Sequence, residues 1–163
     1  MPERPAYEVA HLSEIPHTPT DAAAHGLAIP GEWRQIRHHF GIREFSANAF
    51  VATEAGQEIV HEHSERANDD PTQPGDEELY LVASGRARVR LDDEELEAGP
   101  GTLVFVGEPR VVRSFTALEA GTTILTFGTN PGVEFVVSRF EQDVSPPPRW
   151  DRGEPARREE GRT

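Results

Sequence analysis

Short apolar stretches alternate with turn-forming residues over most of this chain. Eight stretches rich in Val, Phe, Leu and Thr have the character of β-strands, and Gly, Pro, Asp or Asn separates most of them. They span residues 49–53, 58–63, 79–83, 87–91, 103–106, 110–115, 122–127 and 133–137. This spacing predicts an all-β protein built as an antiparallel sandwich or barrel.

Two segments near the N-terminus have a helical pattern instead. One is the short, alanine-rich segment Thr20–Gly26. The other is Gly31–Phe40, where apolar residues recur at helical spacing and Gly41 follows as a helix-ending residue. The residues before Trp33 are rich in proline and glycine, and we expect them to form an arm along the barrel.

These patterns divide the chain into three parts. Residues 1–41 form the N-terminal arm and one short helix, residues 42–140 form the barrel, and residues 141–163 form a flexible charged tail. The tail holds three consecutive prolines and many charges, with Trp150 as its large apolar residue, so it buries too little to offset its ordering entropy. Trp150 either stays in the tail or is pinned to the body.

Composition then excludes several classes of function. The 163 residues suit one domain with a single core. The net charge of −13 would repel nucleic acid and anionic membranes, and no apolar run is long enough to cross a bilayer, so we expect a soluble cytoplasmic protein. Cysteine and lysine are both absent, which excludes disulfides, thiol nucleophiles and Schiff bases. Any chemistry must depend on His, carboxylates, Tyr, Ser, Arg or a metal.

The most informative motif is His61-Glu62-His63 with Glu78 beyond a polar loop. Alternate residues of a strand share a face, so His61 and His63 would point the same way. Two imidazoles and a carboxylate form a mixed N/O ligand set that first-row divalent metals favour. The alternative is that both histidines line the barrel and are satisfied by protein neighbours without a metal.

These residues resemble the first motif of the cupin superfamily. Gly56, His61, His63, Glu78 and Gly85 fit its glycine, HxH, glutamate and glycine, and six residues separate Glu78 from Gly85. The second cupin motif is similar to residues 99–110, so the resemblance covers roughly residues 49–127. It implies a double-stranded β-helix, or jelly-roll barrel. Because one scaffold hosts many activities, the resemblance is far less specific for function.

Two departures from the cupin pattern matter. Where metal-binding relatives supply a fourth ligand, a histidine, the matching position here is Arg110, and arginine cannot donate a lone pair to a metal. The spacer from Ser64 to Glu77 is also long, with 14 residues, and is either decoration or a lid over the cavity mouth. If Arg110 lies in the cavity, it pairs with Glu78, with another acid or with an anionic ligand group.

The resemblance favours a divalent metal (Fe, Mn, Zn or Ni) held by His61, His63 and Glu78. Glu77 competes for the carboxylate position, but strand alternation places Glu78 with Tyr80 and favours it. The predicted function is a metal-dependent oxygenase- or isomerase-like enzyme acting on a small anionic substrate. Arg110 would hold the anion and Tyr80 would donate or relay a proton.

Other functions stay open at this level. The main alternative is a metal-free, non-catalytic cupin that binds a ligand or serves as a structural module. We also expect a homodimer, because pairing would cover apolar sheet surface and strand edges. A third possibility is an assembly protein that uses the stripe Arg86, Arg88 and Arg90, although such a stripe is most simply a solvated strand face.

Overall fold

The computed structural model describes residues 9–18, 29–65 and 75–129. These form nine strands in two antiparallel sheets, together with one 3-10 helix and one short α-helix. The strands are β1 (Glu32–Arg34), β2 (Ser46–Val51), β3 (Glu58–His63), β4 (Glu77–Ser84), β5 (Ala87–Leu91), β6 (Glu94–Ala98), β7 (Leu103–Val106), β8 (Arg113–Ala117) and β9 (Thr123–Thr129). The helices are η1 (Leu12–Glu14) and α2 (Ile36–Phe40). The all-β prediction is therefore confirmed.

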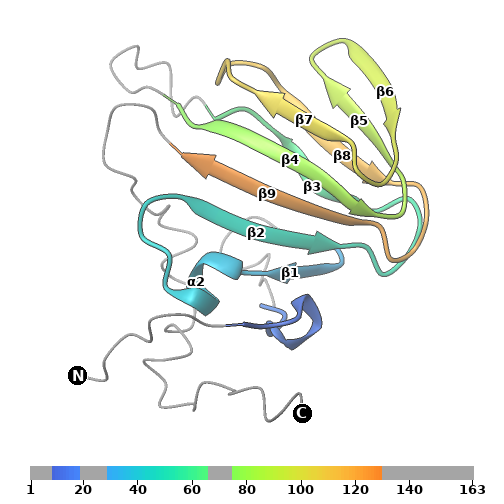
Figure 1. Cartoon of the computed structure of the whole chain (residues 1–163). Helices are drawn as coiled ribbons and strands as arrows, with labels where there is room; N and C mark the ends of the chain where they lie inside the picture. The colour runs from blue at the N-terminus through green and yellow to red at the C-terminus, as the bar shows by residue number, and fades with distance from the viewer. Residues whose placement is uncertain (1–8, 19–28, 66–74, 130–163) are drawn as a thin grey trace.

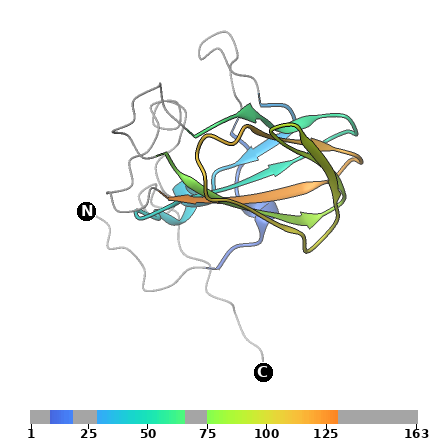
Figure 2. The same ribbon diagram turned by 90° about the horizontal axis from the view of Figure 1, so that it is seen from above.

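The strand order produces a jelly-roll barrel. One sheet has the order β1-β2-β9-β4-β7 and the other has the order β3-β8-β5-β6. Neighbours in space are mostly far apart in sequence, which is typical of Greek-key connections. The two sheets curve around a common interior (Figures 1 and 2). This interior holds the core and, as shown below, the candidate site.

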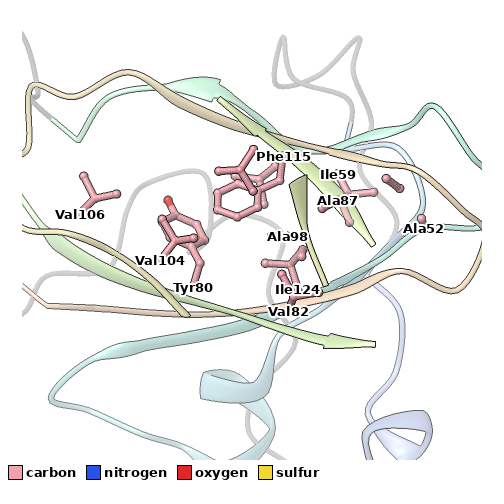
Figure 3. Packing of buried hydrophobic residues seen from close by; sticks show 13 residues of the cluster. Ala52, Ile59, Tyr80, Val82, Ala87, Ala98, Val104, Val106, Phe115 and Ile124 are labelled. Carbon is pink, nitrogen blue, oxygen red and sulfur yellow. The ribbon is translucent and has the colours of Figure 1, made fainter. Parts of the chain in front are cut away.

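The core comes from inward-facing positions of both sheets. Figure 3 shows its buried side chains, which include Ile59, Val82, Ala87, Phe115 and Ile124, each at 0% exposure. Along β5 the buried Ala87 and Val89 alternate with exposed arginines, as a half-buried strand requires. At the β4–β5 turn Gly85 has φ +68°, and a Cβ there would lie 2.5 Å from the Thr122 hydroxyl oxygen. Only glycine meets both demands.

The N-terminal part differs in detail from its prediction. Trp33 lies in β1 rather than in a helix, and its indole nitrogen donates to the Asn48 side chain at 3.0 Å. The helix is therefore shorter than expected, and it ends at Gly41 with φ 62°, as predicted. Residues ahead of β1 lie along it, because the Thr18 amide donates to the Trp33 carbonyl at 2.9 Å. The expected helix Thr20–Gly26 and strand 133–137 lie outside the described residues.

The sequence pattern did not predict β6, and it placed β8 too early. β6 has four exposed residues out of five, so it lacks the apolar alternation that marks a strand, and register with β5 defines it instead. β8 begins at Arg113, three residues later than the expected 110–115. Arg110 consequently lies in the loop before β8.

Within the described residues, no helix is long and apolar enough to cross a membrane.

Candidate functional site

Four polar side chains meet inside the barrel between the two sheets. Glu78 and Tyr80 project inward from β4, while His63 on β3 and Arg113 on β8 come from the opposite sheet. His63 and Arg113 are paired across the β3–β8 ladder, which brings their side chains together. Strands that are distant in sequence thus assemble one polar cluster.

Arg113 is the centre of this cluster. Its side chain is fully buried, and the guanidinium donates twice to Glu78 Oε2, from Nη2 at 2.5 Å and from Nε at 3.1 Å. Nη1 donates to the Val111 carbonyl at 3.0 Å and to the Pro109 carbonyl at 3.5 Å. Every guanidinium nitrogen therefore has a partner, which is what a buried cation requires.

Tyr80 reinforces the same carboxylate. Its hydroxyl donates to Glu78 Oε2, and its ring packs against Phe115 with centroids 4.6 Å apart. Burial, and then the charge of Glu78, raise the pKa of Tyr80 well above its ordinary value. The hydroxyl is thereby held in its protonated form as a fixed donor. The role of Tyr80 as a proton donor or relay stays a prediction.

The ionisation of Glu78 follows from its partners. Burial by itself would raise the pKa of Glu78, but the donors His63, Tyr80 and Arg113 together outweigh burial and lower it. The carboxylate is therefore charged at neutral pH. Oε2 of this carboxylate already accepts hydrogen bonds from Arg113 and Tyr80, so protein groups satisfy the hydrogen-bonding capacity of this oxygen.

His63 is oriented by the backbone. Its Nδ1 lies 2.6 Å from the His61 carbonyl, which can only accept, so Nδ1 carries a proton. Nε2 then faces two carboxylates, Glu65 Oε1 at 3.3 Å and Glu78 Oε2 at 3.6 Å. Burial lowers the pKa of His63, but Glu65, Glu78 and the His61 carbonyl outweigh it and raise the pKa to about 9. The imidazole is therefore cationic at neutral pH.

A third acid, Asp76, lies near Glu65 and Glu78. Burial, with added repulsion from Glu65 and Glu78, raises the pKa of Asp76 to about 6, while the charge of Arg113 acts in the opposite direction. Acidic groups thus outnumber the two cations His63 and Arg113 at this end of the barrel. The local balance of charge is mildly negative.

A cavity of about 360 Å³ adjoins the cluster. This size lies at the lower end of the range for small-molecule sites. Apolar side chains form part of its wall, and the polar part comes from β2, β3, β4, β9 and the residues just after β3. The lining residues are Ile29, Asn48, Phe50, Ile59, Val60, His61, Glu62, His63, Glu65, Glu78, Tyr80 and Thr126. None of these described lining residues is an arginine.

The structure brings together some of the predicted site residues and separates others. His63, Glu78 and Tyr80 lie in the cluster, and Glu77 lies outside on the other face of β4, as alternation predicts. His61 lines the cavity, but its Nδ1 faces Glu58 at 3.6 Å. The β3–β8 register shifts between Val60 and His63, and both imidazoles line the same cavity. A metal ion shared by His61 and His63 stays a prediction.

Arg110 is not in the cavity, which corrects the prediction for this residue. Its side chain is exposed in the loop before β8, and among the described residues Arg113 is the arginine that pairs with Glu78. The prediction took Arg110 from its position at the end of the second cupin motif, and the strand expected to begin there begins three residues later. Arg113 stands two residues before the buried Phe115, so alternation back from Phe115 was the signal that could have identified it.

Glu65 is the other residue that the sequence reading missed. It follows His63 by two positions, so it continues the alternating series from His61. Within the described part of the chain, His63, Glu65 and Glu78 each offer a ligand atom within 4.8 Å of the others. A His/Glu/Glu set thus stands where a His/His/Glu set was predicted, and the Arg113 guanidinium lies 3.6 Å from Glu65 as well as against Glu78.

Comparison with known proteins identifies the fold. No family model matches the chain, and no curated protein sequence matches it. A cupin protein from Bacteroides fragilis superposes with a TM-score of 0.50 at 17% identity, over 68% of this chain and 86% of that one. The protein therefore has the cupin fold, as the motif resemblance implied.

Two further solved structures are similar at a lower level. A cupin-superfamily sugar phosphate isomerase from Silicibacter pomeroyi has a TM-score of 0.49 at 18% identity, over 60% of this chain and 58% of that one. KdgF from a Halomonas species has a TM-score of 0.48 at 14% identity, over 61% of this chain and 79% of that one. This chain thus spans less than two thirds of the isomerase. Likeness at this level concerns the fold and not the activity.

Proposed function

We propose that this protein is a metal-independent, small-molecule-binding cupin. The observation that carries the proposal is the fully buried Arg113, which makes two hydrogen bonds to the carboxylate predicted to bind the metal. The guanidinium lies against two of the three possible ligands, so its charge repels a divalent cation, and its hydrogen bonds use lone pairs of Glu78 Oε2 that a cation would need. The adjoining cavity then binds its ligand by shape and hydrogen bonding.

The chemistry of the cavity wall defines the class of ligand. Glu65 and Glu78 present acceptors, while Phe50, Ile59 and Val60 present apolar surface. The cation His63 lies between two carboxylates, so its charge is already compensated. With Arg110 exposed and Arg113 behind Glu78, a ligand anion would meet no free guanidinium there. We therefore propose a neutral or cationic ligand with hydrogen-bond donors, in place of the anionic ligand expected from Arg110.

A ligand-observed NMR screen in EDTA tests this proposal. The library contains matched neutral, cationic and anionic compounds small enough for a cavity of about 360 Å³. Neutral and cationic compounds should bind without added metal, and His61→Trp, which narrows the cavity while leaving the Arg113–Glu78 pair intact, should abolish binding. Arg88→Ala, on the outer face of β5, serves as the control and should bind normally. Binding that requires a divalent ion, or that selects anions, would reject the proposal.

One observation favours a second candidate, a divalent metal at His63, Glu65 and Glu78. These three residues have ligand atoms within 4.8 Å of one another, and the Nδ1 contact of His63 to a carbonyl is typical of metal-bound histidines. Such an ion would supply Lewis-acid chemistry to a ligand in the cavity. Binding it requires that Arg113 move away from Glu78, so Arg113→His should increase metal affinity if this candidate is correct.

A further inference from the structure

The outer face of the five-stranded sheet carries an apolar hollow that the proposed function does not use. It has a volume of about 380 Å³, and its apolar lining is Phe45, Leu79, Phe105 and Phe127. Phe105 is 64% exposed, and the neighbouring Leu103 is 61% exposed. A contiguous exposed patch of large apolar side chains marks an interaction surface. We call the surface formed by Phe45, Leu79, Phe105 and Phe127 the outer hollow.

Strand register makes the hollow part of a larger apolar surface. Leu79 on β4 pairs with Phe105 on β7 and with Phe127 on β9, which forms one cross-strand row. Leu81 pairs with Leu103 and Leu125 in the same way and forms a second row. Paired residues share a face of the sheet, so both rows point outward.

The same face is covered at its other end. Ala47 continues the first row onto β2, where it is 1% exposed, and α2 packs against that strand. Figure 1 shows α2 beside β2 and away from β7. The face is therefore closed near β2 and open from β9 to β7, so it is the open part that needs a covering segment.

We infer that residues 133–137 of this chain cover the outer hollow. Thr129, the last described residue before them, itself lines the hollow, so the chain leaves the barrel at this surface. Neighbouring strands lie about 4.8 Å apart, so β7 is about 10 Å from β9, and the three residues 130–132 can span about 10 Å when extended. The segment is long enough to reach every part of the hollow.

The sequence of the segment fits this surface. Val133, Phe135 and Val137 alternate along it, so an extended chain would present all three to one side. Three apolar side chains could then pack on the two apolar rows of the sheet. The segment provides the apolar partner that the rows lack among the described residues.

Charge favours this segment over a second copy of the chain. Glu44 and Glu77 stand at the rim of the hollow, and each copy has a net charge of −13. A face-to-face pair would bring these acids together, which costs free energy. The segment carries a single acid, Glu134, and Arg139 follows it closely, so residues 133–140 together bring no net charge to the hollow.

Engineered cysteines test the inference cleanly, because the chain has no cysteine of its own. In the full chain, the pair Leu103→Cys/Val137→Cys should form an intramolecular disulfide about ten-fold faster than Leu103→Cys/Val136→Cys, since disulfide geometry is specific and the side chain of residue 136 would point away. Equal rates for the two pairs, or a product dominated by disulfide-linked dimers, would overturn the inference.

Sedimentation and dye binding give a second, independent readout. Phe135→Ser should uncover the hollow and raise the binding of an apolar fluorescent dye several-fold, because such dyes bind exposed apolar surface. The matched control Val136→Ser should leave dye binding unchanged, and both variants should sediment like the wild type. If Phe105→Ser converts a dimer to a monomer while Phe135→Ser does not, a second copy covers the hollow and the inference is wrong.

Discussion

The protein contains the same ion pair, arginine with glutamate, in two very different surroundings. Inside the barrel, Arg113 and Glu78 are 0% and 14% exposed, and Nη2 and Oε2 are 2.5 Å apart. On the outer face of β5, Arg88 and Glu95 are 49% and 59% exposed and 3.2 Å apart. Water screens the outer pair, whereas the inner pair must satisfy its own charges. The same type of ion pair therefore organises the site inside the barrel, whereas on the outer face it is only part of a water-exposed strand surface.

Removal of the inner cation should produce the largest effect. Arg113→Met leaves Glu78 and Glu65 without their main counter-charge inside the barrel. We therefore expect the free energy of unfolding to fall by about 3 to 5 kcal/mol. Chemical denaturation with a fluorescence readout measures this difference. The double variant Arg113→Met/Glu78→Met should be more stable than Arg113→Met alone, and a double variant that is less stable would show that the two residues do not act as a pair.

Removal of the phenol hydroxyl should have an intermediate effect. Tyr80→Phe keeps the ring contact with Phe115 but deletes the hydroxyl that donates to the charged Glu78. A hydrogen bond to a charged group contributes about 1.5 to 3 kcal/mol, so the free energy of unfolding should fall by that amount. An unchanged stability in Tyr80→Phe would mean that Arg113 alone satisfies Glu78.

The pH dependence of stability should identify His63. Its pKa is raised to about 9 in the folded protein from 6.5, so protonation stabilises the fold fully below pH 6.5, and this contribution is lost as the pH rises through 9. The melting temperature should therefore fall between pH 7 and pH 9.5, below the ordinary tyrosine pKa of about 10. His63→Gln should flatten this fall. If the melting temperature of His63→Gln falls equally steeply, groups other than His63 cause the pH dependence.

The outer pairs should give the smallest effect. Arg88→Ala removes a side chain that is 49% exposed, and exposed ion pairs contribute at most about 1 kcal/mol. Denaturation midpoints of Arg88→Ala and the wild type should nearly coincide, and 0.5 M salt should change both alike. A loss as large as that of Arg113→Met would remove the distinction between the two regions.

The sequence allowed the barrel and part of the site to be predicted for physical reasons. Strands such as Glu58–His63 and Leu103–Val106 have apolar positions bounded by turn residues, so their positions follow from pattern alone. Glu78 and Tyr80 share a face in an uninterrupted stretch of β4, so alternation predicts that both point inward. The jelly-roll fold follows once these strands are paired.

The sequence could not reveal the parts of the site that depend on register. The pairing of β3 with β8 is bulged, and no local pattern in the sequence marks that bulge or predicts that Nδ1 of His61 faces Glu58. The choice between Arg110 and Arg113 depends on where β8 begins, and strand ends are set by tertiary pairing as well as by local preference. The homodimer, the cytoplasmic location and the domain boundaries stay predictions.

The central claim is that Arg113, rather than a metal, satisfies Glu78. The most direct measurement is the metal content of the full chain, purified from metal-supplemented culture and dialysed against buffer without chelator. The wild type should carry well below one divalent ion per chain, and His63→Ala and Glu65→Ala should carry no less than the wild type. About one tightly held ion per chain, lost in both variants, would contradict the account and favour the metal site.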